Sequence, residues 1–162
     1  MTSKRRTLKS SEAKQLLQDF KQRFARFPLD LQSKHKIEEV VIDEAKLYLM
    51  DNNPFAVSVG STLVPSLLNE QVLKTLPLIV VDMGAIPHIC NGADVMRPGI
   101  REIQGEFEAG DAILVKDMRF GKPIAIGIAE ASSESMREMS KGKAARNVHF
   151  VGDRFWNAVK KP

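Results

Sequence analysis

The feature that most constrains the fold is a series of short Val- and Ile-rich segments, separated by turn residues, that fills the second half of the chain. Each segment is long enough for a strand and too short for an average helix. Strands are expected at or near residues 78–81, 94–97, 113–115, 123–129, 147–151 and 155–159. Only two segments have helical spacing, at residues 86–90 and 132–139, the second with Ser132 as its cap. Many short strands with two short helices predict a small, partly closed barrel.

The first half of the chain predicts a separate α+β domain. Apolar residues recur at helical spacing from Leu16 to Phe27, where Ser10 or Ser11 can cap the helix and Pro28 can end it. Val- and Ile-rich strands follow between residues 36 and 64, and a short helix is expected at residues 67–76. We therefore expect an N-terminal α+β domain at residues 1–76, with a flexible basic arm at 1–9, and a mostly β domain at residues 77–162.

Composition and charge limit the classes of function. The net charge is +4, and residues 1–30 hold eight Lys or Arg against three acids, which favours a polyanionic partner. The single cysteine, Cys90, excludes an intrachain disulfide and a thiolate zinc cluster. No apolar run approaches the roughly 20 residues that span a bilayer, and no apolar core follows the basic N-terminus as in a secretory signal. These patterns indicate a cytoplasmic protein without a membrane partner.

An ordered set of short motifs in residues 78–159 resembles the PUA domain, which is named after pseudouridine synthases and archaeosine transglycosylases. The blocks are Asp82-x-Gly84-Ala85, Gly92-Ala93-x-Val95-Met96-x-Pro98-Gly99-Ile100, Phe107-x-x-Gly110-Asp111, Ile124-Ala125-Ile126-Gly127, Lys141-Gly142 ahead of His149, and Gly152-Asp153-x-x-Trp156. The resemblance implies a PUA pseudobarrel with two short helices. Any single block is weak evidence, but the blocks occur in the same order.

The layout of the whole chain, a small domain directly ahead of a PUA domain, is similar to a particular family. It resembles the oncoprotein first described as multiple copies in T-cell lymphoma, together with its archaeal relatives and the N-terminal part of ligatin. These proteins bind the small ribosomal subunit and assist translation re-initiation and recycling. The further domains of ligatin have no counterpart in these 162 residues, so functions that need them are not implied.

The resemblance also implies an RNA-facing surface on the short helix and the strand after it. The residues that map there are Gly84, Gly92, Ala93, Val95, Arg97, Pro98 and Gly99. Glycine lacks a Cβ and lets the backbone approach a sugar-phosphate chain, and the planar guanidinium of arginine can fork onto phosphate. The alternative is that the glycines only permit turns.

Three basic residues of this half add to the candidate surface. Arg97 has no partner nearby in sequence, because strand spacing puts Asp94 on the opposite face; the alternative is a pair with Glu102 or Glu106. Lys143 and Arg146 follow the last predicted helix, where they either complement its C-terminus or form an auxiliary phosphate patch.

Other candidate sites are weaker. His88 and Cys90 are two residues apart but lack further ligands nearby in sequence, so no metal site is expected. Asp82, Asp94 and Asp111 each lie beside a turn or helix start, where Asp commonly caps. Phe155 and Trp156 could stack on bases, although core packing is favoured for the tryptophan. No catalytic residue and no cofactor is expected.

The sequence thus predicts a non-catalytic RNA-binding protein of the translation machinery. Its expected partners are structured RNA (rRNA or tRNA), the small ribosomal subunit and an initiation-factor-like protein. Its expected role is in initiation, re-initiation or recycling. Two alternatives stay open: an RNA-binding accessory subunit of a tRNA- or rRNA-modifying enzyme, and an adaptor that binds only protein.

Overall fold

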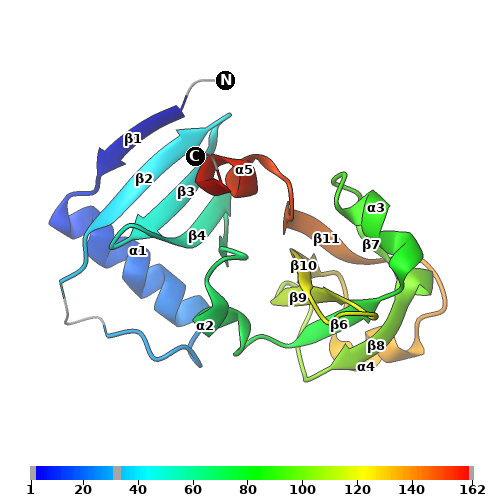
Figure 1. The fold of residues 1–162 in the computed structure, drawn as a ribbon. Helices are drawn as coiled ribbons and strands as arrows, with labels where there is room; N and C mark the ends of the chain where they lie inside the picture. Colours follow the sequence, from blue (N-terminus) through cyan, green and yellow to red (C-terminus); the bar gives the residue numbers. More distant parts are fainter. Residues whose placement is uncertain (1–2, 31–33, 161–162) are drawn as a thin grey trace. The chain divides into compact units, whose positions relative to one another are not determined.

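The computed structural model describes residues 3–30 and 34–160 and divides the chain into two compact units, Met1–Thr75 and Leu76–Pro162. The first unit contains an antiparallel sheet with the strand order β1-β2-β3-β4-β5 (Figure 1). The elements of this unit are β1 Ser3–Thr7, α1 Ser10–Arg23, β2 Ile37–Ile42, β3 Ala45–Met50, β4 Asn53–Val59, β5 Thr62–Pro65 and α2 Glu70–Leu73. Each strand pairs with the next strand along the chain: β2 to β5 follow one another as hairpins, whereas the connection from β1 to β2 contains α1.

Helix α1 lies across one face of this sheet and carries the aromatic core of the unit (Figure 1). The fully buried ring of Phe20 lies 4.4 Å from the ring of Phe55 on β4 and 4.7 Å from that of Phe24. The helix ends at Arg23, earlier than the predicted stop at Pro28, because Phe24 leaves the helical conformation at φ −122°. Phe27 nevertheless stays in the cluster, at 6.3 Å from Phe20.

The start of α1 also differs from the prediction. Ser10 or Ser11 was expected to cap the helix, but Ser10 is already its first residue and Lys9 occupies the cap position. The backbone N–H of Lys9 donates to Glu12 Oε1 at 2.9 Å, so the carboxylate of the first turn satisfies a donor at the helix start.

The expectation of a flexible arm at residues 1–9 is wrong for Ser3–Thr7, which form β1 and pair with β2 over five residues. Arg5 lies 2.7 Å from the buried Glu38, and Arg6 lies 3.3 Å from the buried Glu39. The hydrogen bond from Arg5 is the main reason that the pKa of Glu38 is lowered. Arg5 and Arg6 therefore pair with acids of the neighbouring strand, which local sequence does not reveal. Residues 1 and 2 lie outside the described residues.

The second unit is a curled sheet with the order β7-β11-β10-β9-β6-β8, which confirms the predicted mostly β architecture with short helices (Figure 1). The pairing of β6 with β9 is parallel, and the other pairings are antiparallel. The strands are β6 Leu78–Val81, β7 Val95–Met96, β8 Ile100–Gln104, β9 Ala112–Asp117, β10 Pro123–Ala129 and β11 Lys143–Phe150. The helical segments are η1 Met83–Ala85, α3 Ile86–Ile89, η2 Arg97–Gly99, α4 Ser133–Glu138 and α5 Arg154–Lys160.

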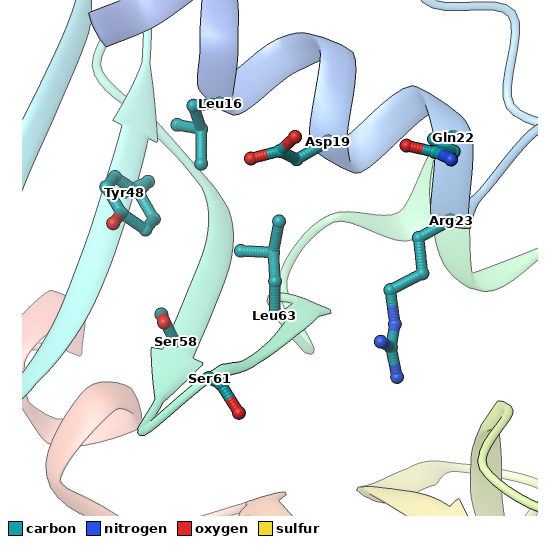
Figure 2. A pocket seen from close by; sticks show the side chains of 8 residues that line it. All are labelled: Leu16, Asp19, Gln22, Arg23, Tyr48, Ser58, Ser61 and Leu63. Carbon is teal, nitrogen blue, oxygen red and sulfur yellow. The ribbon is translucent and has the colours of Figure 1, made fainter.

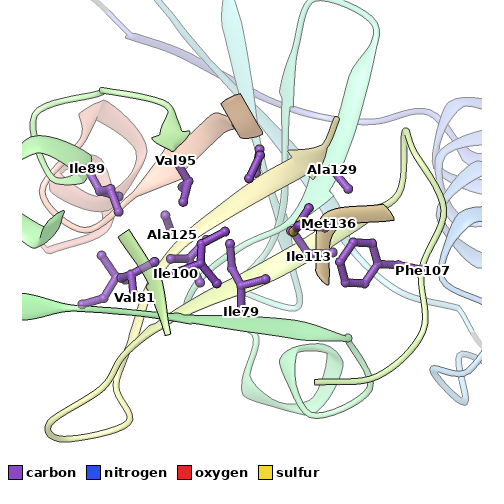
Figure 3. Close-up of a cluster of buried hydrophobic side chains, with 14 residues drawn as sticks. Ile79, Val81, Ile89, Val95, Ile100, Phe107, Ile113, Ala125, Ala129 and Met136 are labelled. Carbon is purple, nitrogen blue, oxygen red and sulfur yellow. The ribbon is translucent and has the colours of Figure 1, made fainter. Parts of the chain in front are cut away.

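The core of this unit lies between the strands of the curled sheet and its short helices (Figure 3). Ile79 and Val81 of β6, Ile113 of β9 and Met136 of α4 are all fully buried in it. Ser132 caps α4 as expected, since its Oγ accepts the backbone N–H of Ser135 at 3.1 Å.

Three details of the second unit differ from the sequence prediction. Residues 155–159, expected as a strand, belong to α5, because Asp153 Oδ1 accepts the backbone N–H of Trp156 as a helix cap does. Strand β8 was not predicted, since two charged residues separate its isoleucines, Ile100 and Ile103, so the strand at this edge of the sheet lacks the usual apolar–polar alternation. The strand expected at residues 94–97 is only the two-residue β7, and Arg97 already belongs to η2.

Candidate RNA-binding surface

The candidate surface is the stretch from Asp82 to Arg101, in which η1, α3, β7 and η2 follow one another between strands β6 and β8. Its two ends are tied together. The N–H of Asp82 donates to Gly99 O at 2.9 Å, and Asp82 Oδ2 lies 2.7 Å from Arg101 Nη2. Asp82 Oδ1 also accepts the N–H of Ala85 at 3.0 Å, so this side chain caps η1 as predicted. The stretch is therefore a closed loop with an ordered backbone.

The three candidate glycines occur at their positions for different local structural reasons. Gly92 has φ +96° just after α3, a left-handed conformation that favours glycine where a helix ends. Gly99 has ordinary φ, but a Cβ there would lie 3.4 Å from the Cβ of Ala85, at the closure of the loop. At Gly84 a Cβ would lie 3.3 Å from the capping oxygen of Asp82. The turn explanation therefore accounts for Gly92, and the glycines do not by themselves prove a ligand.

The side chains of the other predicted residues divide into exposed and buried ones. Ala93 and Pro98 are exposed and can meet a ligand directly. Val95 is 2% exposed and packs in the core, so its side chain cannot contact RNA (Figure 3).

Asn147 on β11 organises the surface, although it belongs to none of the sequence motifs. Its Nδ2 donates to the carbonyl oxygens of Ile89 and Ala93, both at 3.0 Å, and its backbone N–H donates to Asp94 Oδ1 at 2.9 Å. These bonds hold the end of α3 and the loop after it against β11. The donor lies more than 50 residues from its acceptors, and no local pattern signals the pairing.

The expectation that Arg97 is free of partners is wrong. Its Nε donates to Met136 O at 2.7 Å, its Nη1 donates to Ile100 O at 3.1 Å, and the side chain is half-buried. The alternative partners Glu102 and Glu106 do not hold it either, since these two bonds go to carbonyl oxygens. The guanidinium therefore joins the last turn of α4 to the start of β8. A contact of Arg97 with RNA stays a prediction.

We expect Arg97→Glu to lower the free energy of unfolding by about 2 kcal/mol, because two carbonyl oxygens lose a charged donor and face a carboxylate. Urea unfolding at neutral pH measures this. Lys141→Glu, an exposed charge reversal in the same unit, is the control and should change stability by less than about 0.5 kcal/mol. Unchanged stability of Arg97→Glu together with lost RNA affinity would instead assign the guanidinium to the ligand.

Lys143 and Arg146 were predicted to lie at the end of a helix, but both belong to strand β11. Lys143 Nζ lies 3.1 Å from Asp94 Oδ2 and 3.9 Å from Glu130 Oε1, so its charge is shared with two acids. The N–H of Asn147 and then Lys143 lower the pKa of Asp94, against the effect of its burial. Arg146 is exposed. A phosphate patch on β11 would therefore depend on both side chains turning toward the ligand.

The remaining candidates are placed as follows. His88 is exposed on α3, and Cys90 is half-buried against the core, where burial raises the pKa of its thiol. Phe155 is the buried aromatic of α5 and Trp156 only half-buried, the reverse of the expected order. Within residues 3–30 and 34–160, no three His, Cys, Asp or Glu side chains gather as metal ligands would. No helix in this part of the chain is long and apolar enough to cross a membrane.

The first unit has a hollow of about 450 Å³ between α1 and the sheet (Figure 2). It is lined by Leu16, Asp19, Gln22, Arg23, Tyr48, Ser58, Ser61 and Leu63. Burial, followed by the charge of Glu39, raises the pKa of Tyr48 to about 12, so its hydroxyl stays protonated at neutral pH. The lining mixes one acid, one base and uncharged polar side chains with two leucines, which does not single out a ligand class.

The fold and the ordered loop define the class of the protein. The family model of the PUA domain, an RNA-binding domain, matches residues 77–151. An uncharacterized protein of Methanocaldococcus jannaschii is 36% identical over 157 residues, covering 95% of this chain and 96% of its own. A hypothetical protein of Pyrococcus horikoshii has a TM-score of 0.78 and 28% identity, covering 96% of this chain and 99% of its own.

Three proteins with names that describe a role or origin are also similar to the chain. Translation machinery-associated protein 20 of Saccharomyces cerevisiae is 27% identical over 122 residues, 71% of this chain and 67% of its own. Malignant T-cell-amplified sequence 1 of Rattus norvegicus is 31% identical over 85 residues, 51% of this chain and 47% of its own. A probable tRNA pseudouridine synthase B of Pyrobaculum aerophilum is 36% identical over 82 residues, 51% of this chain and 24% of its own. The chain belongs to the PUA-domain family that includes the translation machinery-associated and malignant T-cell-amplified proteins.

Proposed function

We propose that this protein binds structured RNA through its PUA domain and acts in translation, on the small ribosomal subunit or on tRNA, in initiation, re-initiation or recycling. The observation that carries the proposal is the similarity to translation machinery-associated protein 20, which extends over 71% of the chain and so beyond the length of the PUA domain. Exposed Gly84, Gly92, Ala93 and Pro98 offer a surface that an RNA backbone can approach closely. An initiation-factor-like protein is a further proposed partner.

The proposed function includes no catalysis by the protein itself. The histidine of the second unit that pairs with an acid is His149, whose Nδ1 lies 2.7 Å from Asp153 Oδ2. Their side chains are only 2% and 6% exposed, so neither can reach a nucleic-acid substrate. This pair has a structural role instead.

Ala93→Glu tests the proposal because it places a negative charge on the exposed loop. Binding of the wild type to purified small ribosomal subunits and to tRNA should fall with salt, with a log–log slope of roughly −2 to −4 for three to five phosphate contacts. The variant should bind at least about tenfold more weakly, a loss of about 1.4 kcal/mol. Ala158→Glu, on an exposed position of α5, is the matched control and should bind as the wild type does.

Other results would contradict the proposal. Equal binding by the wild type and Ala93→Glu would remove the loop from the interface. A flat salt response with capture of proteins from nuclease-treated extract would favour the adaptor that binds only protein. Co-purification with a tRNA-modifying enzyme would favour an accessory subunit, the second candidate, which the similarity to a pseudouridine synthase supports. Reproducible cleavage or modification of RNA would show catalysis.

A further inference from the structure

The turn between β9 and β10, residues Met118–Lys122, is here called the β9–β10 tip. It exposes two large apolar side chains, Met118 at 53% and Phe120 at 64%. These are two of the four exposed large apolar side chains in residues 3–30 and 34–160. Phe120 contributes little to the core at this exposure, and an exposed aromatic ring beside a second apolar side chain is typical of a contact with a ligand.

The tip is held in one conformation by the buried carboxylate of Asp117, which is 3% exposed. Its Oδ1 accepts the backbone N–H of Phe120, and its Oδ2 accepts that of Lys122 at 3.1 Å. Gly121 has φ +67° and donates its N–H to Asp117 O at 3.1 Å, which closes the turn. Because these bonds order the backbone before any ligand arrives, Phe120 is presented without a large ordering cost.

Positive charge surrounds the ring. The Arg119 guanidinium carbon lies 5.3 Å and Lys122 Nζ lies 5.9 Å from the centroid of the Phe120 ring. The N–H of Phe120 is the largest of the effects that lower the pKa of Asp117, so this acid stays ionised, but its charge is directed at the backbone of the turn. The exposed side chains of the tip therefore combine one aromatic ring with two cations.

The tip emerges beside the candidate RNA-binding surface. Strands β6 and β9 are parallel, with Val81 opposite Asp117, so both strands end at the same edge of the sheet. The N–H of Met118 donates to Val81 O at 3.0 Å, and Asp82, where the candidate surface begins, is the next residue. One RNA molecule can therefore reach both features.

We propose that the β9–β10 tip binds an unpaired nucleotide of the RNA, with the base stacked on Phe120 and Arg119 and Lys122 on the neighbouring phosphates. The proposal rests on the proposed RNA-binding function and specifies the kind of RNA: structured, with an unpaired segment next to it. Base stacking on an aromatic ring between cations is the general chemistry of single-strand binding. An exposed tip with two cations suits a nucleotide better than an apolar peptide, which needs a groove.

The test uses the full chain and two labelled probes, an oligoadenylate of about ten nucleotides and a blunt RNA duplex of similar length. Phe120→Ala should weaken binding of the oligoadenylate about tenfold and leave duplex binding nearly unchanged. Phe120→Trp should restore the loss because it restores the stacking face. The double variant Arg119→Gln/Lys122→Gln should reduce the log–log salt slope for oligoadenylate by about 1.4, since two phosphate contacts are lost.

Lys14→Gln, an exposed lysine of the first unit, is the control for charge and should leave the slope within about 0.7 of the wild type. All variants should melt as the wild type does, because the replaced side chains are exposed. If the wild type binds small subunits or tRNA but not oligoadenylate, or if Phe120→Ala binds oligoadenylate unchanged, the inference is wrong while the proposed function stands. If no RNA binds to the wild type, the proposed function itself fails. If Phe120→Ala bound both RNA probes as the wild type does but lost binding to a protein partner, the tip would be assigned to that partner and the inference would be overturned.

Discussion

Asp153→Ala should lower the free energy of unfolding of the second unit by about 3 kcal/mol, through the loss of several buried hydrogen bonds. The Asp153 carboxylate lies 2.7 Å from His149 Nδ1 and accepts the backbone N–H groups of Phe150 at 2.8 Å and Trp156 at 2.9 Å. It thereby joins the end of β11 to the start of α5. Alanine would leave the buried His149 and two N–H groups without this acceptor.

Urea unfolding at neutral pH measures this loss of stability. The control is Glu138→Ala, which removes an exposed carboxylate of α4 and should change the free energy of unfolding by less than about 0.5 kcal/mol. The contribution should also depend on pH. Burial alone would raise the pKa of Asp153, but the hydrogen bonds from His149 and the backbone outweigh it and the pKa is lowered. The stabilisation is therefore present above pH about 4 and is lost as pH falls through the lowered pKa. An equal acid response of wild type and Asp153→Ala would contradict this account.

Phe20→Ala should lower the stability of the first unit by about 3–5 kcal/mol, since it empties the centre of the aromatic cluster. The ring of Phe20 is fully buried and lies within 4.4–6.3 Å of the rings of Phe24, Phe27 and Phe55. Removing it takes away the ring contact between Phe20 of α1 and Phe55 of β4.

Hydrogen exchange separates this effect from a general loss of stability, because the chain has two units that need not unfold together. Amides of β2 and β3 should lose protection, whereas those of β9 and β10 should keep it. Gln18→Ala on the exposed face of α1 is the control, and Phe20→Leu should cost less than half as much. Unaltered protection in β2 and β3 would show that the cluster does not hold α1 on the sheet.

Those parts of the fold that depend on local pattern could be predicted from the sequence. β6 and β10 are short apolar runs, Ser132 caps α4, and Gly92 ends α3 with positive φ. β1 could not be recognised, because its residues are polar and basic and its stability depends on Glu38 and Glu39, more than 30 residues away.

In the candidate surface, too, the features set by local sequence could be predicted and those that depend on distant residues could not. The resemblance to the PUA domain placed the surface in the stretch around α3 and β7, but it did not say which side chains face outward. Val95 turned into the core, and Arg97 bonds to a carbonyl 39 residues away. Phe120, whose exposure makes it a candidate for stacking, belongs to none of the motif blocks. Partners that come together only in three dimensions leave no periodic signal in the chain.

The pairing of β7 has a consequence for how the protein matures during its own synthesis. β7 is an edge strand that pairs with β11, and Asn147 holds carbonyls that precede it by 54 and 58 residues. The first unit closes through hairpins between strands that are consecutive in sequence, so it can fold while the rest is still being made. The loop from Asp82 to Arg101 cannot take its final form until β11 has left the exit tunnel. A nascent chain would therefore gain its stable N-terminal unit first and its candidate RNA surface last.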